Sequence, residues 1–333
     1  ISQFSLSPEL TRSLPNLGEQ DIFRSMQLLP GVSGSNESSS GLVVRGGTID
    51  QNLVLFDDYT VYHVDHVFGF FSAFNNNAIK DVQFYKGGFG AKYGGRNSSV
   101  MDIKTRTGNR KKYSGKVSSS TYMSKVLFEA PIGKKGPDGL APSSLMISAK
   151  SSYLDQISPY VYPYVATEYG GLPFSFQDIF GKYSIESRGG NRVNLFGFNF
   201  NDAVRFAGDK SISWQSNGYG ADFLVIPSSS GTIIEAHLAQ SNYKIQSTEL
   251  SNRPRESSID GFNGGLDFTY LLRKYDEFKY GLEFVGFRTD YQYTNSVGRT
   301  LDQIQNTTEI GGYLDYKRQI GRLLIQPGFR LHN

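Results

Sequence analysis

The sequence has no cysteine in its 333 residues, which excludes disulfide bonds, thiol catalysis and cysteine-based metal sites within it. It has no run of about 18 apolar residues, so it contains no candidate transmembrane helix. An excess of one charge is also lacking: 34 lysines and arginines against 31 aspartates and glutamates give a net charge of +3, too small to indicate a nucleic-acid partner. The opening residues, ISQFSLSPEL, lack the basic start and apolar centre of a signal peptide.

Aromatic residues and glycine are abundant instead. The sequence has 24 phenylalanines, 21 tyrosines and 37 glycines, but only one tryptophan. This excess, with little helical patterning, favours an all-β chain whose outer rings meet lipid headgroups. The mean hydropathy of −0.37 does not oppose this interpretation, because a membrane barrel strand needs only about ten alternating residues.

Residues 41–109 consist of short apolar runs separated by pairs of turn residues. The runs are Leu42–Val44, Leu53–Phe56, Val82–Tyr85 and Val100–Ile103, and the pairs are Gly46-Gly47, Asp57-Asp58, Gly87-Gly88 and Gly94-Gly95. Runs of this length between turn residues predict strands of a small compact unit. A short helix is expected in Gln20–Leu29, where apolar residues recur at helical spacing before Pro30, and a helical turn in Asn75–Lys80.

After residues 107–112 the pattern changes to alternation of apolar and polar residues. The alternating segments are Val126–Ile132, Thr232–Leu238, Phe262–Leu272, Phe278–Phe284 and Leu323–Leu331. Strands with one apolar and one polar face fit either a barrel wall in lipid or a soluble sandwich. Long polar loops at 246–258 and 293–308, against short ones such as 189–191, favour the barrel. So do the tyrosines at the ends of the apolar faces, which are Tyr153, Tyr270, Tyr280 and Tyr291.

Four phrases carry a resemblance to a known family: LLPGV (28–32), VRGGTIDQNLVLFDD (44–58), VYHVDHVFGFFSAFN (61–75) and KGGFGAKYGGRNSSVMDI (86–103). They resemble the plug domain of TonB-dependent outer-membrane transporters, most closely the form common in Bacteroidetes-type bacteria. The resemblance implies a membrane all-β fold, a plugged antiparallel β-barrel of about 22 strands with a small α/β plug domain inside it. It assigns the plug domain to residues 1–109 and the N-terminal portion of the transmembrane β-barrel to residues 110–333.

The number of strands predicts that the barrel is incomplete in this sequence. Residues 113–333 provide about ten or eleven strand segments at roughly twenty residues each, about half of what the family barrel needs. Half a barrel leaves two unpaired edges in lipid. We therefore expect more barrel after Asn333. By the same resemblance, an export signal and the TonB-contacting segment (the Ton box) are expected upstream of Ile1.

The resemblance also indicates a lock between plug and barrel. Arg45 and Arg96 match two plug arginines that pair with glutamates of the barrel wall in the family, and Glu309 stands where the family carries one such glutamate. A guanidinium in a narrow lumen needs a carboxylate partner, because burying it unpaired is costly. The alternative is that all three are ordinary surface charges. The glycines that would let each arginine pass the backbone are Gly46, Gly47, Gly94 and Gly95.

Three further motifs are interpreted structurally. Asp57 is expected to accept turn amides, with a ligand or metal contact as the alternative; the family usually carries glycine next, and Asp58 departs from that. His63, Asp65 and His66 hint at a metal site, but strand geometry turns His66 away from the other two, and His66 matches a family packing position. KGGFGAKYGGR looks like a phosphate loop, but a strand rather than a helix follows it. We predict no metal, no cofactor and no enzyme activity.

The function implied by the resemblance is TonB-dependent active import of a scarce nutrient, of siderophore, glycan, peptide or vitamin class, across the outer membrane. The implied partners are the TonB complex of the inner membrane, outer-membrane lipid and a small-molecule or oligomeric nutrient ligand. A surface lipoprotein is a further option, and no nucleic acid is expected. One alternative is a non-transporting, receptor-like subunit of a larger outer-membrane assembly. Another is a soluble β-rich binding protein.

Overall fold

The computed structural model describes most of the chain. The described residues are 3–7, 11, 21–34, 41–69, 71–162, 164, 171–206, 210–228, 230–248, 255–273, 276–295 and 297–333. The middle of the loop expected at 246–258 lies outside them.

The first part of the chain forms a compact unit, the N-terminal unit, around a five-stranded sheet. The sheet order is β1-β8-β9-β4-β5, with β4 parallel to β9 and the other pairs antiparallel. The four apolar runs predicted as strands are confirmed, in β3, β4, β8 and β9. The elements of the unit are β1 (Gln3–Leu6), α2 (Ile22–Gln27), β2 (Val32–Gly34), β3 (Leu42–Val44), η1 (Ile49–Gln51), β4 (Asn52–Phe56), β5 (Tyr59–Thr60), β6 (Asp65–His66), η2 (Val67–Gly69), β7 (Phe71–Ser72), η3 (Asn76–Ala78), β8 (Ile79–Tyr85) and β9 (Ser99–Thr105).

The expected helix is confirmed as α2. Asp21 caps its N-terminus, because one carboxylate oxygen accepts the backbone N–H groups of Phe23 at 2.7 Å and Arg24 at 3.2 Å. Phe23 and Met26 point into the core and are almost completely buried. The cap fixes where the helix starts, and burial of its apolar face holds it against the sheet. The helical turn expected in Asn75–Lys80 is shorter, because β8 already begins at Ile79.

The turn between β4 and β5 is tight although aspartate stands where the resemblance led us to expect glycine. Asp57 and Asp58 have φ angles of 50° and 71°, both in the left-handed region. Two such residues make the hairpin turn whose twist matches that of its strands. Aspartate tolerates this conformation because its short polar side chain can bond locally. The turn leaves both carboxylates at the tip of the hairpin.

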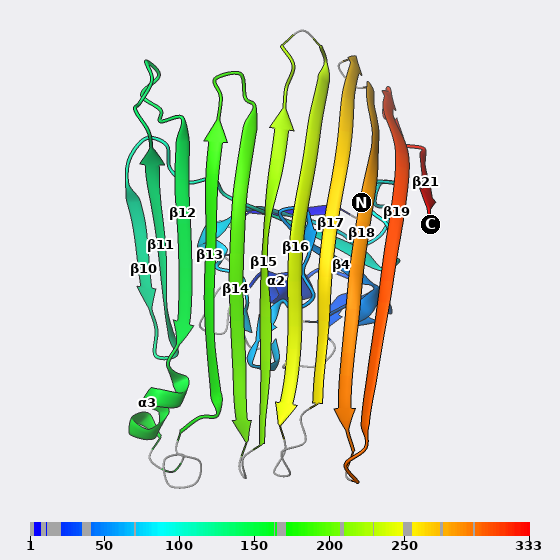
Figure 1. Cartoon of the computed structure of the whole chain (residues 1–333). Helices are drawn as coiled ribbons and strands as arrows, with labels where there is room; N and C mark the ends of the chain where they lie inside the picture. The colour runs from blue at the N-terminus through cyan, green and yellow to red at the C-terminus, as the bar shows by residue number, and fades with distance from the viewer. Residues whose placement is uncertain are drawn as a thin grey trace.

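The second part of the chain forms a twelve-stranded sheet, the long sheet, with antiparallel pairing throughout (Figure 1). Neighbours in the chain are neighbours in the sheet, apart from β21, which pairs with β19. None of the helices among the described residues is long and apolar enough to cross a membrane. The elements are β10 (Ser114–Ser119), β11 (Met123–Ile132), β12 (Ser143–Ser152), α3 (Leu154–Val161), β13 (Phe174–Glu186), β14 (Arg192–Phe206), β15 (Lys210–Val225), β16 (Thr232–Thr248), β17 (Arg255–Arg273), β18 (Asp276–Thr294), β19 (Thr300–Ile320), β20 (Leu323–Ile325) and β21 (Gly328–His332).

The two faces of the long sheet are opposite in character to those of a soluble sandwich. In β17 the apolar residues Phe262 and Leu266 are 50% and 38% exposed, whereas the polar residues Asn263 and Asp267 between and beside them are 7% and 6% exposed. The same alternation recurs along β11, β16 and β18. An apolar face left open and a polar face buried suit a sheet whose outer surface meets lipid. The predicted period of two is therefore confirmed.

The prediction of a long loop at 293–308 is wrong. β18 continues to Thr294 and β19 begins at Thr300, so most of that stretch is strand. Pairing continues between polar residues, such as Gln292 opposite Asp302. Backbone ladder bonds need no apolar side chain, so a polar outer face does not end a strand. The start of the loop predicted at 246–258 is also strand, because β16 runs to Thr248.

The single alternating strand expected over Leu323–Leu331 is divided into β20 and β21. Pro327 lies between them, and proline has no N–H to give to a ladder. Its carbonyl still accepts the N–H of Tyr316 at 3.0 Å, which keeps the end of the chain on β19.

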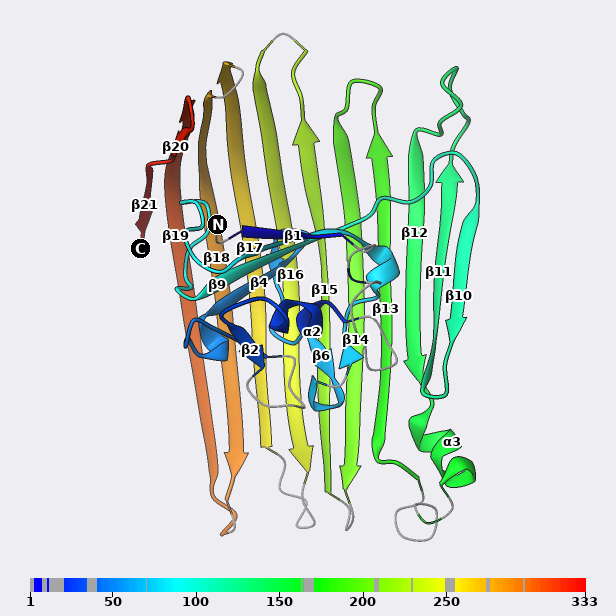
Figure 2. The same cartoon turned by 180° about the vertical axis from the view of Figure 1, so that it is seen from behind.

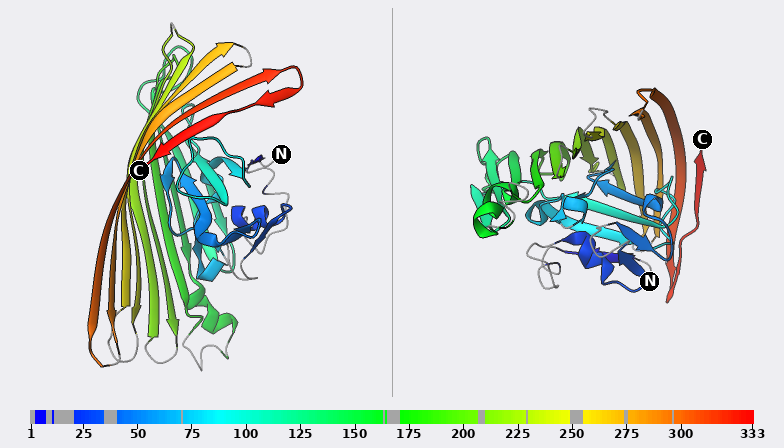
Figure 3. Two further views of the ribbon diagram at one scale, coloured as in Figure 1. Left: turned by 90° about the vertical axis from the view of Figure 1, so that its right-hand side faces the viewer. Right: turned by 90° about the horizontal axis from the view of Figure 1, so that it is seen from below.

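The long sheet is curved, and the N-terminal unit lies against its concave face (Figures 2 and 3). Aromatic side chains join the two. Tyr59 stacks on Phe196 at 5.2 Å and on Phe198 at 5.3 Å, and Phe56 meets Phe180 edge to face at 5.3 Å between ring centroids. The inward side chains of the long sheet therefore complete the core of the N-terminal unit.

Candidate functional site

The concave face holds the N-terminal unit through buried ionic and hydrogen-bonded contacts around the aromatic core. The first is the His66 cluster, made of His66, Lys150, Asp178 and Asp202. The His66 Nε2 lies 2.8 Å from Asp178 Oδ2, and Nδ1 lies 3.5 Å from Asp202 Oδ2. Lys150 Nζ lies 3.3 Å from the same Asp178 oxygen and also donates to the carbonyl of Ser72. The side chains of all four are at most 6% exposed.

The charges of the His66 cluster balance when the imidazole is protonated, since two cations then meet two carboxylates. Burial alone would lower the pKa of His66, but Asp178, helped by Asp202, outweighs burial and raises it. The ring also stacks on Phe176 with centroids 4.4 Å apart. His66 thus fastens β6 to strands β13 and β14, beyond the packing role expected from the sequence.

The second contact is at the tip of the β4–β5 hairpin. Asp57 Oδ2 lies 3.1 Å from Lys182 Nζ of β13, and both side chains are 3% exposed. The other carboxylate oxygen accepts the N–H of Thr105 at 2.9 Å, and the Thr105 hydroxyl lies 2.9 Å from Lys182 Nζ. The expected role of Asp57, accepting amides, is thus combined with an ion pair to the long sheet that the sequence did not indicate.

The third contact, the Lys92 cluster, comprises Asp58, Lys92, Lys104 and Asp267. Lys92 Nζ lies 2.9 Å from Asp267 Oδ2 of β17 and 3.9 Å from Asp58 Oδ1, and Lys104 Nζ lies 2.5 Å from that Asp58 oxygen. Burial would raise the pKa of Asp58, but the charges of Lys104 and then Lys92 outweigh it and hold the pKa well below its usual range. Burial would likewise lower the pKa of Lys92, which Asp58 and Asp267 raise well above its usual value. Asp58 and Lys92 are therefore charged at neutral pH.

In the fourth contact, the end of the long sheet binds the glycine-rich segment KGGFGAKYGGR. Arg330 of β21 lies 2.5 Å from Glu283 Oε2 and donates to the carbonyl of Lys92 at 2.8 Å. A Cβ at Gly94 or Gly311 would clash with the Arg330 guanidinium. A side chain at either glycine would therefore require the guanidinium to move.

The two arginines predicted to lock the plug lie on the N-terminal unit, each close to a glycine of that unit. The Arg45 guanidinium lies over Gly87 of its own unit, 3.0 Å from where a Cβ would stand. Arg96 donates to the carbonyl of Gly95 at 2.8 Å. Glu309 comes near the same place, 3.9 Å from the Cβ position of Gly95, and lies 3.2 Å from His332 Nε2. Arg96 and Glu309 share a neighbourhood, and their pairing stays a prediction.

The glycines of the predicted lock have two distinct uses. Gly46 and Gly95 have φ angles of 81° and 74°, which favour glycine. Gly47 has no such angle, but a Cβ there would clash with the side chain of Ser98.

Sequence reasoning missed the lysines and aspartates that hold the unit from the long sheet. The alternation of the strands predicts a polar face turned away from lipid, but it does not indicate which of those polar residues contact the N-terminal unit. Within the described residues, no group of three histidine, aspartate or glutamate side chains could hold a metal ion. His63 lies instead in an aromatic stack, 6.0 Å from Trp214 and 5.6 Å from Tyr243.

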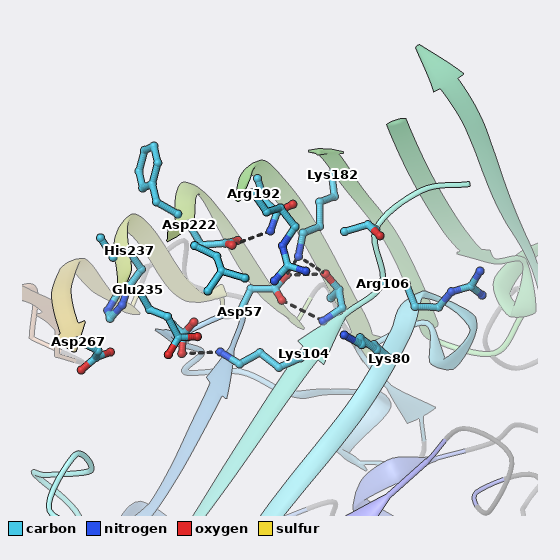
Figure 4. A pocket seen from close by; sticks show the side chains of 17 residues that line it. Asp57, Lys80, Lys104, Arg106, Lys182, Arg192, Asp222, Glu235, His237 and Asp267 are labelled. Carbon is cyan, nitrogen blue, oxygen red and sulfur yellow. Dashed lines mark hydrogen bonds and ion pairs between the residues drawn. The ribbon is translucent and has the colours of Figure 1, made fainter. Parts of the chain in front are cut away.

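A cavity of about 430 Å³ lies beside the hairpin tip, between the N-terminal unit and strands β13 to β17 (Figure 4). Five carboxylates and five lysines or arginines line it. Figure 4 shows Lys80, Arg106 and Lys182 toward one side and Glu235, His237 and Asp267 toward the other. Its lining residues are Asp57, Asp58, Lys80, Lys104, Thr105, Arg106, Thr107, Lys182, Arg192, Asn194, Asp222, Phe223, Leu224, Glu235, Ala236, His237 and Asp267.

Comparison with known proteins identifies most of the N-terminal unit. Residues 11–100 match the family model described as the TonB-dependent receptor plug domain. A search of curated proteins found no match to the chain.

Solved structures share the fold of the whole chain. A mutant of the ferric enterobactin receptor PfeA of Pseudomonas aeruginosa has a TM-score of 0.70 and 13% identity over 99% of this chain and 57% of its own. The siderophore receptor PirA of the same organism has a TM-score of 0.68 and 14% identity over 99% of this chain and 56% of its own. The outer-membrane transporter YddB of Escherichia coli has a TM-score of 0.66 and 11% identity over 99% of this chain and 56% of its own. At such low identity these matches show the fold alone, and the chain spans a little over half the length of each.

Proposed function

Starting from a TonB-dependent receptor plug domain in residues 11–100, seated in the fold of a plugged receptor barrel, we propose that this chain belongs to an active importer of the outer membrane. The cargo is a scarce nutrient of siderophore, glycan, peptide or vitamin class. Residues 1–109 act as the plug and residues 110–333 as the N-terminal portion of the barrel wall. The TonB complex of the inner membrane supplies the force, since the outer membrane holds no ATP.

One observation carries the proposal: a single sheet turns an apolar face outward and grips a folded plug with its inward face. Leu266 is open on the outside of β17, while its neighbour Asp267 bonds Lys92 of the plug on the inside. A barrel wall with lipid on one side and a plug bound by ionic contacts on the other blocks the passive flow of solutes. Solute then passes only when the stopper is rearranged, which is why an energised partner is needed.

Uptake measurements with the full-length receptor test the proposal. Cells that carry or lack TonB are given a panel of radiolabelled ferric siderophores, glycans, peptides and vitamins, and accumulation is followed with and without an uncoupler. We expect at least one probe to accumulate only in energised cells with TonB. Accumulation that is the same without TonB would contradict active import.

The second candidate is a non-transporting subunit of a larger outer-membrane assembly, and nothing in the part of the chain that the structure describes favours it. It predicts that the assembly forms normally while no probe in the panel is taken up. The same experiment therefore separates the two, provided that the receptor is shown to reach the outer membrane.

A further inference from the structure

Three separate segments of the chain meet at one end of the long sheet. They are residues 109–113, which lead from the plug into β10, the β11–β12 connection at 133–142 and the β13–β14 connection at 187–191. Arg110 Nε donates to the carbonyl of Ala141 at 2.7 Å, and its Nη2 donates to the carbonyl of Glu186 at 3.3 Å. Arg188 Nε lies 3.9 Å from Asp138 Oδ2. These contacts hold the segment that follows the plug against the first turns of the wall.

The three segments carry an excess of exposed positive charge. Arg110 is paired with Glu186, whose carboxylate lies 3.1 Å away. The remaining cations are all exposed and together form what we call the basic rim: Lys111, Lys112, Lys134, Lys135 and Arg188. Asp138 is the only acidic residue in the three segments, so it can offset no more than one of these five charges.

The apolar outer face of the wall ends beside the basic rim. Ile132 and Ile185 are the last apolar residues of β11 and β13 and are 39% and 45% exposed. Lys134 follows Ile132 by two residues and Arg188 follows Ile185 by three, which places them at most about 10 Å further along. A bilayer has a polar headgroup layer roughly 5–8 Å thick on each side of its hydrocarbon core. The basic rim therefore reaches the depth of the headgroups.

An exposed tyrosine marks the same boundary. Tyr113, which comes directly after Lys112, is 69% exposed and stacks on Phe128 of β11 with ring centroids 6.4 Å apart. Tyrosine is enriched where a membrane strand leaves the hydrocarbon core, because its ring is apolar and its hydroxyl needs a polar partner. A lysine pair followed by such a tyrosine suits a lipid surface better than it suits a soluble acidic protein.

The longest connection between strands of the long sheet lies at the opposite end. It comprises residues 153–173 and includes α3, at the bottom of Figure 1, whereas the β11–β12 connection is at the top. Transmembrane barrels carry their longer loops outside the cell and shorter turns in the periplasm. Under the function proposed above, the basic rim faces the periplasm.

We propose that the basic rim is a binding surface for anionic phospholipids, whose phosphate groups lie among its lysines while Ile132, Ile185 and Tyr113 contact the acyl chains. The inference rests on the membrane location in the function proposed above and is independent of transport. It assigns a lipid preference to the part of the wall that adjoins the plug, since strands β10 to β14 carry the rim.

Quenching of a fluorophore beside the basic rim by labelled lipids tests the proposal. Ile132→Cys is built in an otherwise cysteine-free full-length receptor and labelled with bimane; the 333 residues contribute no other thiol. The receptor is reconstituted in phosphatidylcholine vesicles with a small, equal fraction of nitroxide-labelled phosphatidylglycerol or nitroxide-labelled phosphatidylcholine. We expect phosphatidylglycerol to quench at least about twofold more, because each lysine or arginine near the surface attracts anionic lipid. Added salt should reduce this preference, since the charges are exposed.

A matched pair of double variants assigns the preference to the basic rim. Lys134→Gln with Lys135→Gln removes two of its exposed cations. Arg288→Gln with Arg299→Gln removes two exposed cations toward the opposite end of the sheet. We expect the first variant to bring the two lipids closer to equal quenching and the second to leave the preference unchanged. Salt dependence in the parent tests the same attraction without any charge substitution.

Equal quenching by the two lipids in the parent, or a preference unchanged in Lys134→Gln with Lys135→Gln, would overturn the lipid surface. An acidic protein that binds the rim instead of lipid would give the first of these results in the purified receptor. Absence of quenching by either lipid would place Ile132 outside the membrane and overturn the location on which both proposals rest. Uptake that is independent of TonB would overturn active import and leave the lipid preference standing.

Discussion

The imidazole of His66 and the carboxylate of Asp178 meet 2.8 Å apart across 112 residues of sequence, with both side chains buried. The pair joins the plug to the middle of strand β13. Because Lys150 contacts the same carboxylate and Asp202 contacts the other ring nitrogen, the four groups neutralise one another only together. Such a unit is costly to break from one side, since the remaining charges stay buried.

Replacing His66 by leucine should loosen the plug strongly. The substitution leaves two buried aspartates with one lysine, and loss of one partner from a buried ion pair costs about 3–5 kcal/mol. The measurement is thermal unfolding and limited proteolysis of the plug in the purified full-length receptor. Lys279→Met serves as the control: it removes a pair with Glu277 in which the lysine is 44% exposed, and should change stability by less than about 1 kcal/mol. A plug as protease-resistant in His66→Leu as in the parent would contradict the assignment.

Attachment of the plug should weaken as the pH rises. The pKa of His66 is higher in the folded protein than in the unfolded chain. The stabilisation of the folded state by protonated His66 is therefore complete below the unfolded pKa of about 6.5 and is lost as the pH rises through the folded pKa. The charged groups facing it are Lys150, Asp178 and Asp202, with His63 and Asp65 nearby in the chain. Protease sensitivity of the plug measured from pH 6 to 9 should therefore increase in the parent. The slope should be lost in His66→Leu; an unchanged slope would place the titration elsewhere.

The strands could be predicted because both of their signals are local. Alternation of apolar and polar residues predicts the strands of the long sheet, and glycine or aspartate pairs predict the turns of the plug. The loop predicted at 293–308 is wrong because polar residues do not end a strand: the pairing of Gln292 with Asp302 depends on backbone bonds alone. The division at Pro327 could have been read from the sequence, since proline cannot donate to a ladder.

The candidate site was less accessible to sequence reasoning. Which inward charge meets which plug residue depends on the curvature of the sheet and on the depth of the plug, and neither leaves a local pattern. Asp57 could be assigned to a turn, but not to Lys182, which lies 125 residues further along the chain. The signal that was available is that a lysine on the buried phase of a membrane strand needs a carboxylate partner.

The ion pair between Asp57 and Lys182 should show strong coupling in a double-mutant cycle. Lys182→Met alone leaves a buried aspartate, and Asp57→Asn alone leaves a buried lysine, so each should destabilise the plug by about 3 kcal/mol or more. Together they should cost less than the sum, because no uncompensated charge remains. Unfolding of the four proteins gives the coupling energy. Additive losses would mean that the two groups do not act as a pair.

Asp21→Asn should stabilise the plug at neutral pH. Burial raises the pKa of Asp21 from 3.8 to about 6. The contribution of protonated Asp21 to the stability of the folded state is therefore complete below about pH 4 and is lost as the pH rises through 6. A shift of about two units corresponds to about 3 kcal/mol at pH 7. Asparagine keeps the helix cap of α2, since its side-chain oxygen can accept the same two N–H groups. Thermal unfolding should favour the variant at pH 7 and show no difference at pH 4. A variant less stable at pH 7 would mean that the ionised carboxylate is stabilising.

The relative importance of the two kinds of lock can be measured as passive leakage. Arg45→Ala with Arg96→Ala tests the lock expected from the resemblance, and Lys92→Met tests the contact seen in the structure. Lys92 bonds Asp267 across the boundary, and losing a charged hydrogen bond of this kind costs about 1–3 kcal/mol. Arg45 lies over Gly87, and Arg96 donates to the carbonyl of Gly95. Both contacts are within the N-terminal unit, so removal of the two arginines should admit less solute than Lys92→Met does.

Entry of a bulky hydrophilic antibiotic into cells without TonB measures this leak independently of transport. We expect Lys92→Met to leak more than the double arginine variant, and the parent least. Lys279→Met, whose pair with Glu277 is exposed, controls for loss of a lysine from the lumen. Leakage in the arginine variant above that of Lys92→Met would show that Arg45 and Arg96 find stronger partners in the whole barrel, with Glu309 the first to examine. Leakage unchanged in the arginine variant would argue against any lock at these two residues, because a plug freed at its fastening points cannot seal a water-filled lumen.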